Sequence, residues 1–131
     1  MRTLTNVFKA LSDQTRLTML GMLLDEGELC VCDFVEALQI TQSKASRHLR
    51  HLVNAGLLND RRAGTWVYFR IIEHPEPAQA RMIEMLPAVL EERVPAEIFE
   101  RLADWKSNKL CAGCSCQQPA SAKAAGKGSA K

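Results

Sequence analysis

Residues 33–71 contain the pattern that most limits what this chain can fold into. A short apolar stretch from Asp33 to Leu38 is followed by Gln39-Ile40-Thr41, and an amphipathic segment then runs as far as Gly56. Thr41 is a residue type preferred at the start of a helix, and Gly56 is one preferred just past its end. The pattern therefore predicts two helices joined by a tight turn, which is a helix-turn-helix.

Two strand-like runs follow this pair of helices directly. They extend from Leu57 to Arg62 and from Thr65 to Ile71, on either side of Ala63-Gly64, and the second run is rich in β-branched and aromatic residues. Such runs around a short glycine-containing turn are typical of a β-hairpin. A basic hairpin directly after a helix-turn-helix is a wing. We therefore expect a mainly α fold with a β-hairpin wing (α+β), a winged helix-turn-helix.

The chain has a formal net charge of only +2, but its positive charge is concentrated in one segment. Residues 41–71 contain six Lys or Arg side chains and a single acidic one. A basic segment on an otherwise acidic body is typical of a surface that binds double-stranded DNA through its phosphates. The candidate DNA contacts lie on the outward face of the second helix and near the hairpin tip: Gln42, Ser43, Lys44, Ser46, Arg47, His48, Arg50, Arg61 and Arg62.

These side chains have the chemistry that a major groove requires. Arginine and lysine can pair with guanine, glutamine with adenine, and serine hydroxyls with phosphates. The alternative is an ordinary solvated helix face. Trp66 and Phe69 are expected in the core rather than as stacking platforms for bases.

Apolar residues at helical spacing predict further helices on both sides of this region. One covers residues 4–11, and a second begins at Ser12 or Asp13 and ends at Gly27. After a linker at residues 73–77, a third covers 82–90, where Pro87 is expected to kink or split it, and a last one covers 95–106. We expect residues 1–108 to form one domain for DNA binding and dimerisation, followed by a cysteine-containing, disordered C-terminal tail at 109–131.

Composition supports a single domain without a membrane partner. The chain has 131 residues and is 47% hydrophobic, enough for one core. It has no apolar run of about 18 residues and begins without a signal peptide, so we expect a cytoplasmic protein. In that compartment its five cysteines are expected as thiols or metal ligands rather than disulfides.

Cys30 and Cys32 stand two residues apart at the entrance of the predicted helix-turn-helix. Side chains at this spacing share one face of a strand but point about 200° apart on a helix. We therefore expect the pair to hold one ion only if the backbone is extended there or unwinds on binding. Thiolates favour soft ions such as As(III), Sb(III), Cd(II), Pb(II) and Cu(I). Either cysteine considered alone is equally well read as a small buried apolar residue.

Several short motifs together resemble the ArsR/SmtB family of metal-sensing winged-helix repressors, and within it the arsenical-resistance repressors. The resemblance covers about residues 7–71. The motifs are LSDQTRL at 11–17, ELCVCD at 28–33, SRHL at 46–49, AGLL at 55–58 and GTWVYFR at 64–70.

The resemblance implies a homodimer that binds operator DNA without an ion and leaves it when As(III) or Sb(III) is captured. It implies that Cys30 and Cys32 are the inducer ligands, with no organic cofactor. It also implies that the first helix and the C-terminal region form the two-fold interface; for the last helix the alternative is that it only covers the back of the wing. On this basis we expect chelation to pull the two sulfurs together, distort the start of the supporting helix and misalign the two recognition helices.

Two departures from the family pattern affect the ligand set. The third cysteine of the best-known arsenic-responsive members is replaced here by Val35. A small thiol, or one of the tail residues Cys111, Cys114 and Cys116, could supply a third sulfur; we expect the pair to be essential and the tail optional. Residues 78–108 contain no histidine, which argues against a zinc site on the C-terminal helix, and residues 1–28 contain no cysteine, unlike cadmium- and lead-sensing relatives.

Other functions remain open at this point. The same fold could respond to Cd(II) or Pb(II) or to thiol oxidation, and the tail cysteines could bind metal separately or be a redox-labile tail. A metal-storage protein would bind through the tail and ignore DNA. An enzyme such as a thiol-dependent arsenate reductase is not expected, because no glycine-rich anion loop accompanies the cysteines.

Overall fold

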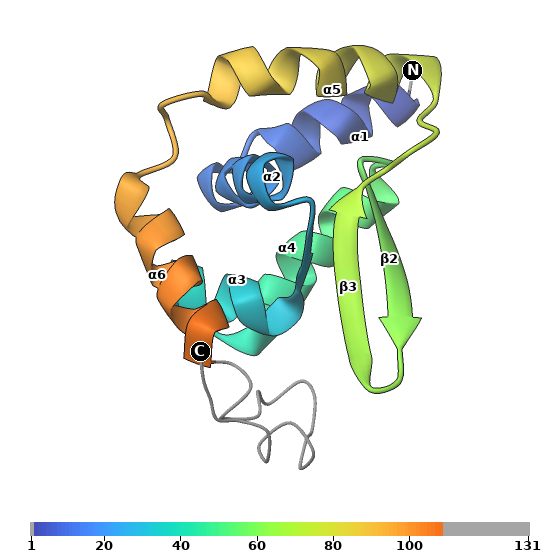
Figure 1. The fold of residues 1–131 in the computed structure, drawn as a ribbon. Helices are drawn as coiled ribbons and strands as arrows, with labels where there is room; N and C mark the ends of the chain where they lie inside the picture. The colour runs from blue at the N-terminus through green and yellow to red at the C-terminus, as the bar shows by residue number, and fades with distance from the viewer. Residues whose placement is uncertain (1, 109–131) are drawn as a thin grey trace.

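The computed structural model describes residues 2–108, and the predicted tail with Cys111, Cys114 and Cys116 lies outside this range. The elements follow in the order α1 (Arg2–Leu11), α2 (Gln14–Glu26), β1 (Glu28–Cys30), α3 (Val31–Leu38), α4 (Gln42–Asn54), β2 (Leu58–Ala63), β3 (Trp66–Ile71), α5 (Pro77–Leu90) and α6 (Ala96–Asn108). The hairpin β2–β3 extends away from the helices on one side, and α5 lies along α1 on the other (Figure 1). This is the expected winged helix-turn-helix.

The helix ends follow the capping residues of the sequence. Asp13 precedes α2 and accepts a hydrogen bond from the Arg16 amide at 3.0 Å, while the Thr41 hydroxyl accepts one from the Lys44 amide at 3.1 Å. Both bonds satisfy amides that a helix start leaves without a partner. Gln39, in the turn between α3 and α4, has a left-handed φ of 60°. Asp13 thus fixes the start of α2, and Gln39 and Thr41 fix the turn between α3 and α4 of the helix-turn-helix.

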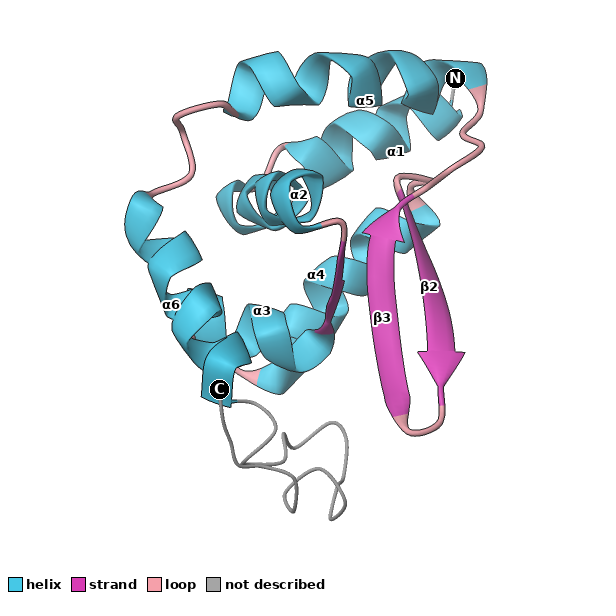
Figure 2. Cartoon of the chain, viewed as in Figure 1, coloured by secondary structure: helices cyan, strands magenta, loops and turns pink. Residues whose placement is uncertain are grey.

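The sheet has one strand more than the sequence predicted. The short strand β1 pairs with β3, so the antiparallel order is β1-β3-β2 (Figure 2). In this pairing Cys30 is opposite Tyr68. Three residues are too few to show the alternation by which a strand is recognised. Helix α3 also begins two residues earlier than expected, at Val31, directly after the strand.

Pro87 does not split α5, which was one of the two outcomes that we expected there. The helix continues through it from Pro77 to Leu90. Leu86 and Leu90, on either side of the proline, are buried, and this packing holds the last turn in place although Pro87 cannot donate a backbone hydrogen bond.

Helix α2 is at the centre of the hydrophobic core, with Met19, Leu20 and Met22 fully buried. By contrast, α1 and α5 expose Phe8, Met85 and Val89 at 52%, 43% and 43% of their surface. Within residues 2–108 no helix combines the length and the apolar character needed to cross a bilayer.

Candidate metal and DNA sites

The two thiols lie side by side at the junction of β1 and α3. Their Sγ atoms are 2.7 Å apart, and both side chains are buried. Cys30 is the N-cap of α3 with an extended backbone (φ −97°, ψ 170°), whereas Cys32 lies in the first helical turn. The change from extended to helical backbone between them turns both side chains to the same side. The sulfurs therefore converge through the extended backbone at Cys30, one of the two conditions that we expected, and the helix does not unwind. They already lie together in this structure, whereas we expected chelation to bring them together.

Asp33 adds a buried carboxylate to the thiol pair. One of its oxygens accepts a hydrogen bond from the Cys30 amide at 2.9 Å, and the other accepts one from the Trp105 indole at 2.8 Å. A carboxylate oxygen and the two sulfurs lie within 4.8 Å of one another. Asp33 thus fixes the backbone of one thiol and joins it to helix α6. It is also an oxygen donor close enough to share an ion with the sulfurs.

Helix α6 is attached to α3 at a second point. The Arg101 guanidinium donates to the Ala37 carbonyl at 2.9 Å, one turn along both helices from the bond between Trp105 and Asp33. Helix α6 therefore covers the back of α3 in this chain, next to the thiols.

Three aromatic side chains cover the thiol pair. Trp66, Tyr68 and Trp105 pack against Cys30 and Cys32 in a cluster separate from the main core. The Trp66 and Tyr68 rings are stacked, with centroids 6.0 Å apart and planes 5° from parallel. Phe69 is in the main core, as expected, whereas Trp66 belongs to the cover of the thiols. These rings therefore limit access to the sulfurs from solvent.

Val35, where better-known relatives have a third cysteine, packs against the main core rather than into this cluster. The other candidate third ligands, Cys111, Cys114 and Cys116, lie outside the described residues.

A groove between α4 and the wing collects most of the predicted DNA contacts. Gln42, Ser43 and Lys44 are exposed at the start of α4, and Thr41 caps it. Arg50 reaches across to Asp60 of β2 at 3.4 Å, joining the helix to the wing. The lining of the groove consists of Val31, Gln42, Ser43, Ser46, Arg47, Arg50, Asp60, Arg62, Thr65, Val67 and Phe69. An exposed helix face and a basic strand thus border one open groove.

Arg61 lies on the opposite face of the wing from Arg62, because successive strand residues point to opposite faces. Its guanidinium makes two hydrogen bonds to the Glu28 carboxylate, at 2.7 and 2.9 Å, and lies 4.8 Å from the centre of the Tyr68 ring. The hydrogen bond from Arg61 lowers the pKa of Glu28. Sequence reasoning grouped the two arginines together, but the structure separates them.

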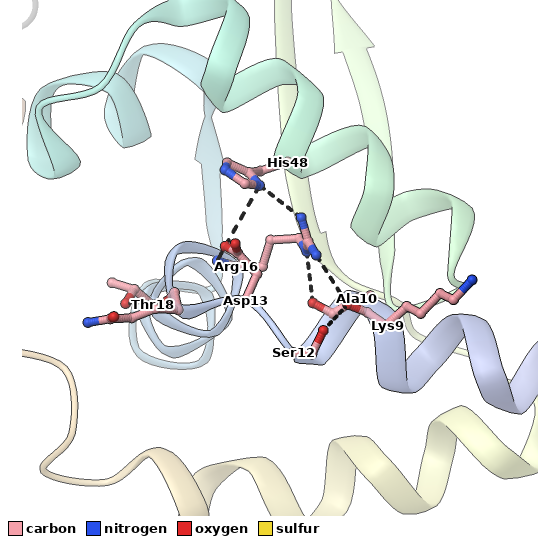
Figure 3. A network of polar contacts seen from close by, with 8 residues as sticks. Lys9, Ala10, Ser12, Asp13, Arg16, Thr18 and His48 are labelled. Atoms are coloured by element: carbon pink, nitrogen blue, oxygen red, sulfur yellow. Dashed lines mark hydrogen bonds and ion pairs between the residues drawn. The ribbon is translucent and has the colours of Figure 1, made fainter.

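His48 is turned toward α2 rather than into the groove (Figure 3). Its Nδ1 accepts a hydrogen bond from Arg16 at 3.0 Å and lies 3.9 Å from the Asp13 carboxylate, and its side chain is only 14% exposed. Arg16 also donates to the carbonyls of Lys9 and Ala10 at the end of α1. His48 is thus engaged in helix packing, and we no longer include it among the candidate DNA contacts.

Burial lowers the pKa of His48; Asp13 opposes this effect, and the nearby Arg16, Lys44 and Arg47 strengthen it. Burial alone would raise the pKa of Asp13, but the hydrogen bond from the Arg16 amide and the charges of His48 and Arg16 hold it below its ordinary value. The network therefore favours a neutral imidazole and a charged carboxylate.

Comparison with known proteins identifies the family. Residues 13–60 match the family described as "Bacterial regulatory protein, arsR family". The chain is 43% identical over 90 residues to the arsenical resistance operon repressor of Escherichia coli K12, and the alignment covers 69% of this chain and 77% of that protein. The chain belongs to the ArsR family.

Two other ArsR-family relatives show the range of functions. Arsenic resistance transcriptional regulator ArsR1 of Pseudomonas putida is 53% identical over 73 residues, which is 56% of each chain, so this chain spans little more than half of that relative. A homolog of the cadmium resistance regulatory protein CadC from Staphylococcus aureus is 46% identical over 65 residues, covering 50% of this chain and 54% of the homolog.

Solved structures of ArsR-type regulators share the fold. The homodimeric winged helix-turn-helix DNA-binding domain Mb0332 from Mycobacterium bovis has a TM-score of 0.57 and 30% identity, covering 72% of this chain and 84% of that one. The antimony-specific transcriptional repressor AntR has a TM-score of 0.52 and 32% identity, covering 66% and 75%. The family is one of DNA-binding transcriptional regulators and not of enzymes.

Sequence reasoning about this ArsR-family chain missed four residues of the thiol site, Asp33, Trp66, Tyr68 and Trp105. Trp66 was missed because the sequence pattern predicted it in the core. Asp33 stands three residues after the N-cap, a spacing at which acidic side chains often bind back to the cap, so it could have been found. Trp105 is 72 residues away from Asp33 and Tyr68 joins Cys30 only through β1, so neither carried a local signal.

Proposed function

We propose that this chain is a homodimeric repressor of arsenical resistance that binds operator DNA in its ion-free form and releases it when As(III) or Sb(III) is captured by Cys30 and Cys32. The observation that carries the proposal is the converging thiol pair at the start of α3, the helix that supports the reading helix α4. Two adjacent buried thiols form a donor set selective for soft, thiophilic ions. The names of the relatives point to the same inducers.

In the ion-free form the groove between α4 and the wing would receive the DNA. The N-terminal half of α4 would enter the major groove, with Gln42, Lys44 and Arg47 at base edges or phosphates and Arg62 on the backbone. Two copies of this groove, related by a two-fold axis, would meet half-sites about one DNA turn apart. The exposed apolar face of α1 and α5 would form the contact between the copies.

Ion capture would act on this arrangement by favouring a second conformation. An ion shifts the equilibrium only to the extent that it binds one conformation better than the other. An allosteric coupling of about 1–3 kcal/mol would change operator affinity roughly 5- to 150-fold. The bond between Asp33 and the Cys30 amide would transmit the change to the backbone at the start of α3.

Operator binding by the double variant Cys30→Ser, Cys32→Ser tests this proposal. Fluorescence anisotropy with the DNA upstream of the chain's own gene gives the dissociation constant with and without arsenite. We expect the variant to bind DNA as the wild type does and to keep it in arsenite. Release of DNA from the variant by arsenite would contradict the proposal.

A matched variant addresses the tail. We propose that Cys111, Cys114 and Cys116 are optional, and that residues 109–131 are a separate tail on the domain of residues 1–108. Replacement of all three by serine should leave release by arsenite intact. If release were lost, the third sulfur would come from the tail and the ranking of pair and tail would be reversed.

A response to Cd(II) is the second candidate function. A relative named for cadmium resistance and the Asp33 carboxylate within reach of both sulfurs favour it, because Cd(II) binds thiolates and also accepts oxygen ligands. Titration of the DNA complex with arsenite, antimonite and Cd(II), and separately with peroxide, distinguishes the inducers from a response to oxidation. A repressor acting on chromosomal DNA would work in the cytoplasm.

A further inference from the structure

One row of side chains runs across the sheet from the thiol site to the outer strand of the wing. Cys30 of β1 is opposite Tyr68 of β3, and Tyr68 is opposite Arg61 of β2. Residues opposite one another in antiparallel strands project on the same face, and their side chains are close enough to interact. The thiol, the ring and the guanidinium therefore follow one another on a single face of the sheet.

Arg61 of β2 also binds back to β1, the strand that holds Cys30. Its two hydrogen bonds end on Glu28, which stands two residues before Cys30 in β1 and shares its face. Arg61 is thus held by the first strand and by the ring of the middle strand at the same time. A displacement of Tyr68 or of β1 changes the surroundings of Arg61 directly.

The opposite face of the same strands borders the DNA groove. Arg62 and Asp60 flank Arg61 in β2, and Val67 and Phe69 flank Tyr68 in β3; all four line the groove. A strand cannot move one face without the other, so a shift on the thiol side also changes the shape of the groove. Cys30 and Cys32 are 0% and 4% exposed, and two of the three rings that cover them belong to β3. An ion bound between the sulfurs would therefore lie against rings of β3, and the room it takes would press on that strand.

We propose that ion capture at the thiol site changes the position of the wing as well as the start of α3. Arg61, which is held by Glu28 and lies over Tyr68, is then a positioning residue that couples the wing to ion capture and not a DNA contact. This inference rests on the proposed function, because it concerns the way in which ion capture reaches the DNA groove. The inference gives Arg61 and Arg62 different roles, a positioning role and a DNA contact, although the two side chains carry the same charge.

The pair Arg61→Met and Arg62→Met tests this assignment in the full-length protein. For each variant the dissociation constant for the upstream DNA is measured without and with saturating arsenite, and the ratio of the two is the release ratio. Saturation is followed by intrinsic fluorescence, because both tryptophans of the chain, Trp66 and Trp105, pack against the thiols.

We expect Arg61→Met to bind ion-free DNA within threefold of wild type, with a release ratio lowered about two- to fivefold, as partly exposed ion pairs and cation–π contacts allow. Arg62→Met should weaken DNA binding about tenfold, as loss of a nucleic-acid contact does, and leave the release ratio unchanged. Glu28→Gln removes the ion pair from the other side and should repeat the Arg61→Met result, which covers the case in which Arg61→Met does not fold.

Two results would overturn the inference. If Arg61→Met weakened ion-free DNA binding as much as Arg62→Met and kept the wild-type release ratio, Arg61 would be a DNA contact. If Arg61→Met and Glu28→Gln both kept the wild-type affinity and release ratio, the row would carry no coupling. Both results leave the proposed function intact, whereas failure of arsenite to release the wild type would remove the proposed function and this inference with it.

Discussion

The hydrogen bond between Trp105 and Asp33 should be one of the stronger single links in the domain. It joins an indole N–H to a carboxylate that is 2% exposed, at 2.8 Å. Hydrogen bonds to charged groups contribute about 1.5–3 kcal/mol, more than those between neutral groups. Because Trp105 itself is only partly buried, we expect a contribution around the lower limit of this range, about 1–2 kcal/mol.

The variant Trp105→Phe removes the donor and keeps an aromatic ring over the thiols. We expect its free energy of unfolding to fall by about 1–2 kcal/mol, which lowers the ratio of folded to unfolded protein about 5- to 30-fold. Urea unfolding measures this change, at a fixed protomer concentration because dimer stability depends on concentration. The urea m-value should stay constant, since the surface exposed on unfolding hardly changes.

A double-mutant cycle with Asp33→Asn isolates the bond from other effects of either substitution. If the bond contributes as proposed, the two substitutions together should destabilise the domain by about 1–2 kcal/mol less than the sum of the single effects. Strict additivity would refute the reasoning, because it would mean that each side chain acts through other contacts. The exposed ion pair of Lys106 with Glu26 supplies a control: Lys106→Met should lower stability by less than about 1 kcal/mol.

Three further predictions follow from described side chains. Because the pKa of His48 is lowered from its ordinary 6.5, folding favours the neutral ring, so its stabilisation is complete above about pH 6.5 and declines as the pH falls toward the folded value. His48→Gln, which does not titrate, should show a smaller loss of stability in urea unfolding between about pH 7 and 5, and an unchanged loss would contradict this. Arg47→Met should lower the slope of log affinity for the operator against log salt concentration by about 1, whereas the distant Lys106→Met should not. Val89→Glu on the exposed α1–α5 face should shift sedimentation from dimer to monomer, and an unchanged mass would place the interface elsewhere.

Most of the fold could be predicted because its elements begin and end at residues with local chemistry. Asp13 and Thr41 cap helices in the structure as the sequence suggests, and Gly27 follows α2 with a φ of 91°. The split that proline's low helix propensity suggested at Pro87 does not occur, because the burial of Leu86 and Leu90 outweighs that propensity. Local signals thus decide helix ends, while tertiary contacts decide the exceptions.

The sites were only partly predictable, because their geometry depends on strand register. A shift of one residue moves every side chain of a strand to the other face. Which of Arg61 and Arg62 lines the groove is therefore fixed by the pairing of β2 with β3, and the link of Arg61 to the thiols by the pairing of β1 with β3. His48 likewise faces α2 because Arg16 meets it there, 32 residues away in sequence.

The junction of β1 and α3 has a consequence for how tightly an ion can be held. Cys30 is the last residue of the strand and Val31 the first of the helix, so no loop residue separates them. Regular backbone on both sides keeps the two donor atoms together before any ligand arrives, and little chain freedom remains to be lost on binding. A glycine inserted at this junction would leave both donors in the chain but restore that freedom, so affinity would fall although the chemistry of the ligands stayed the same.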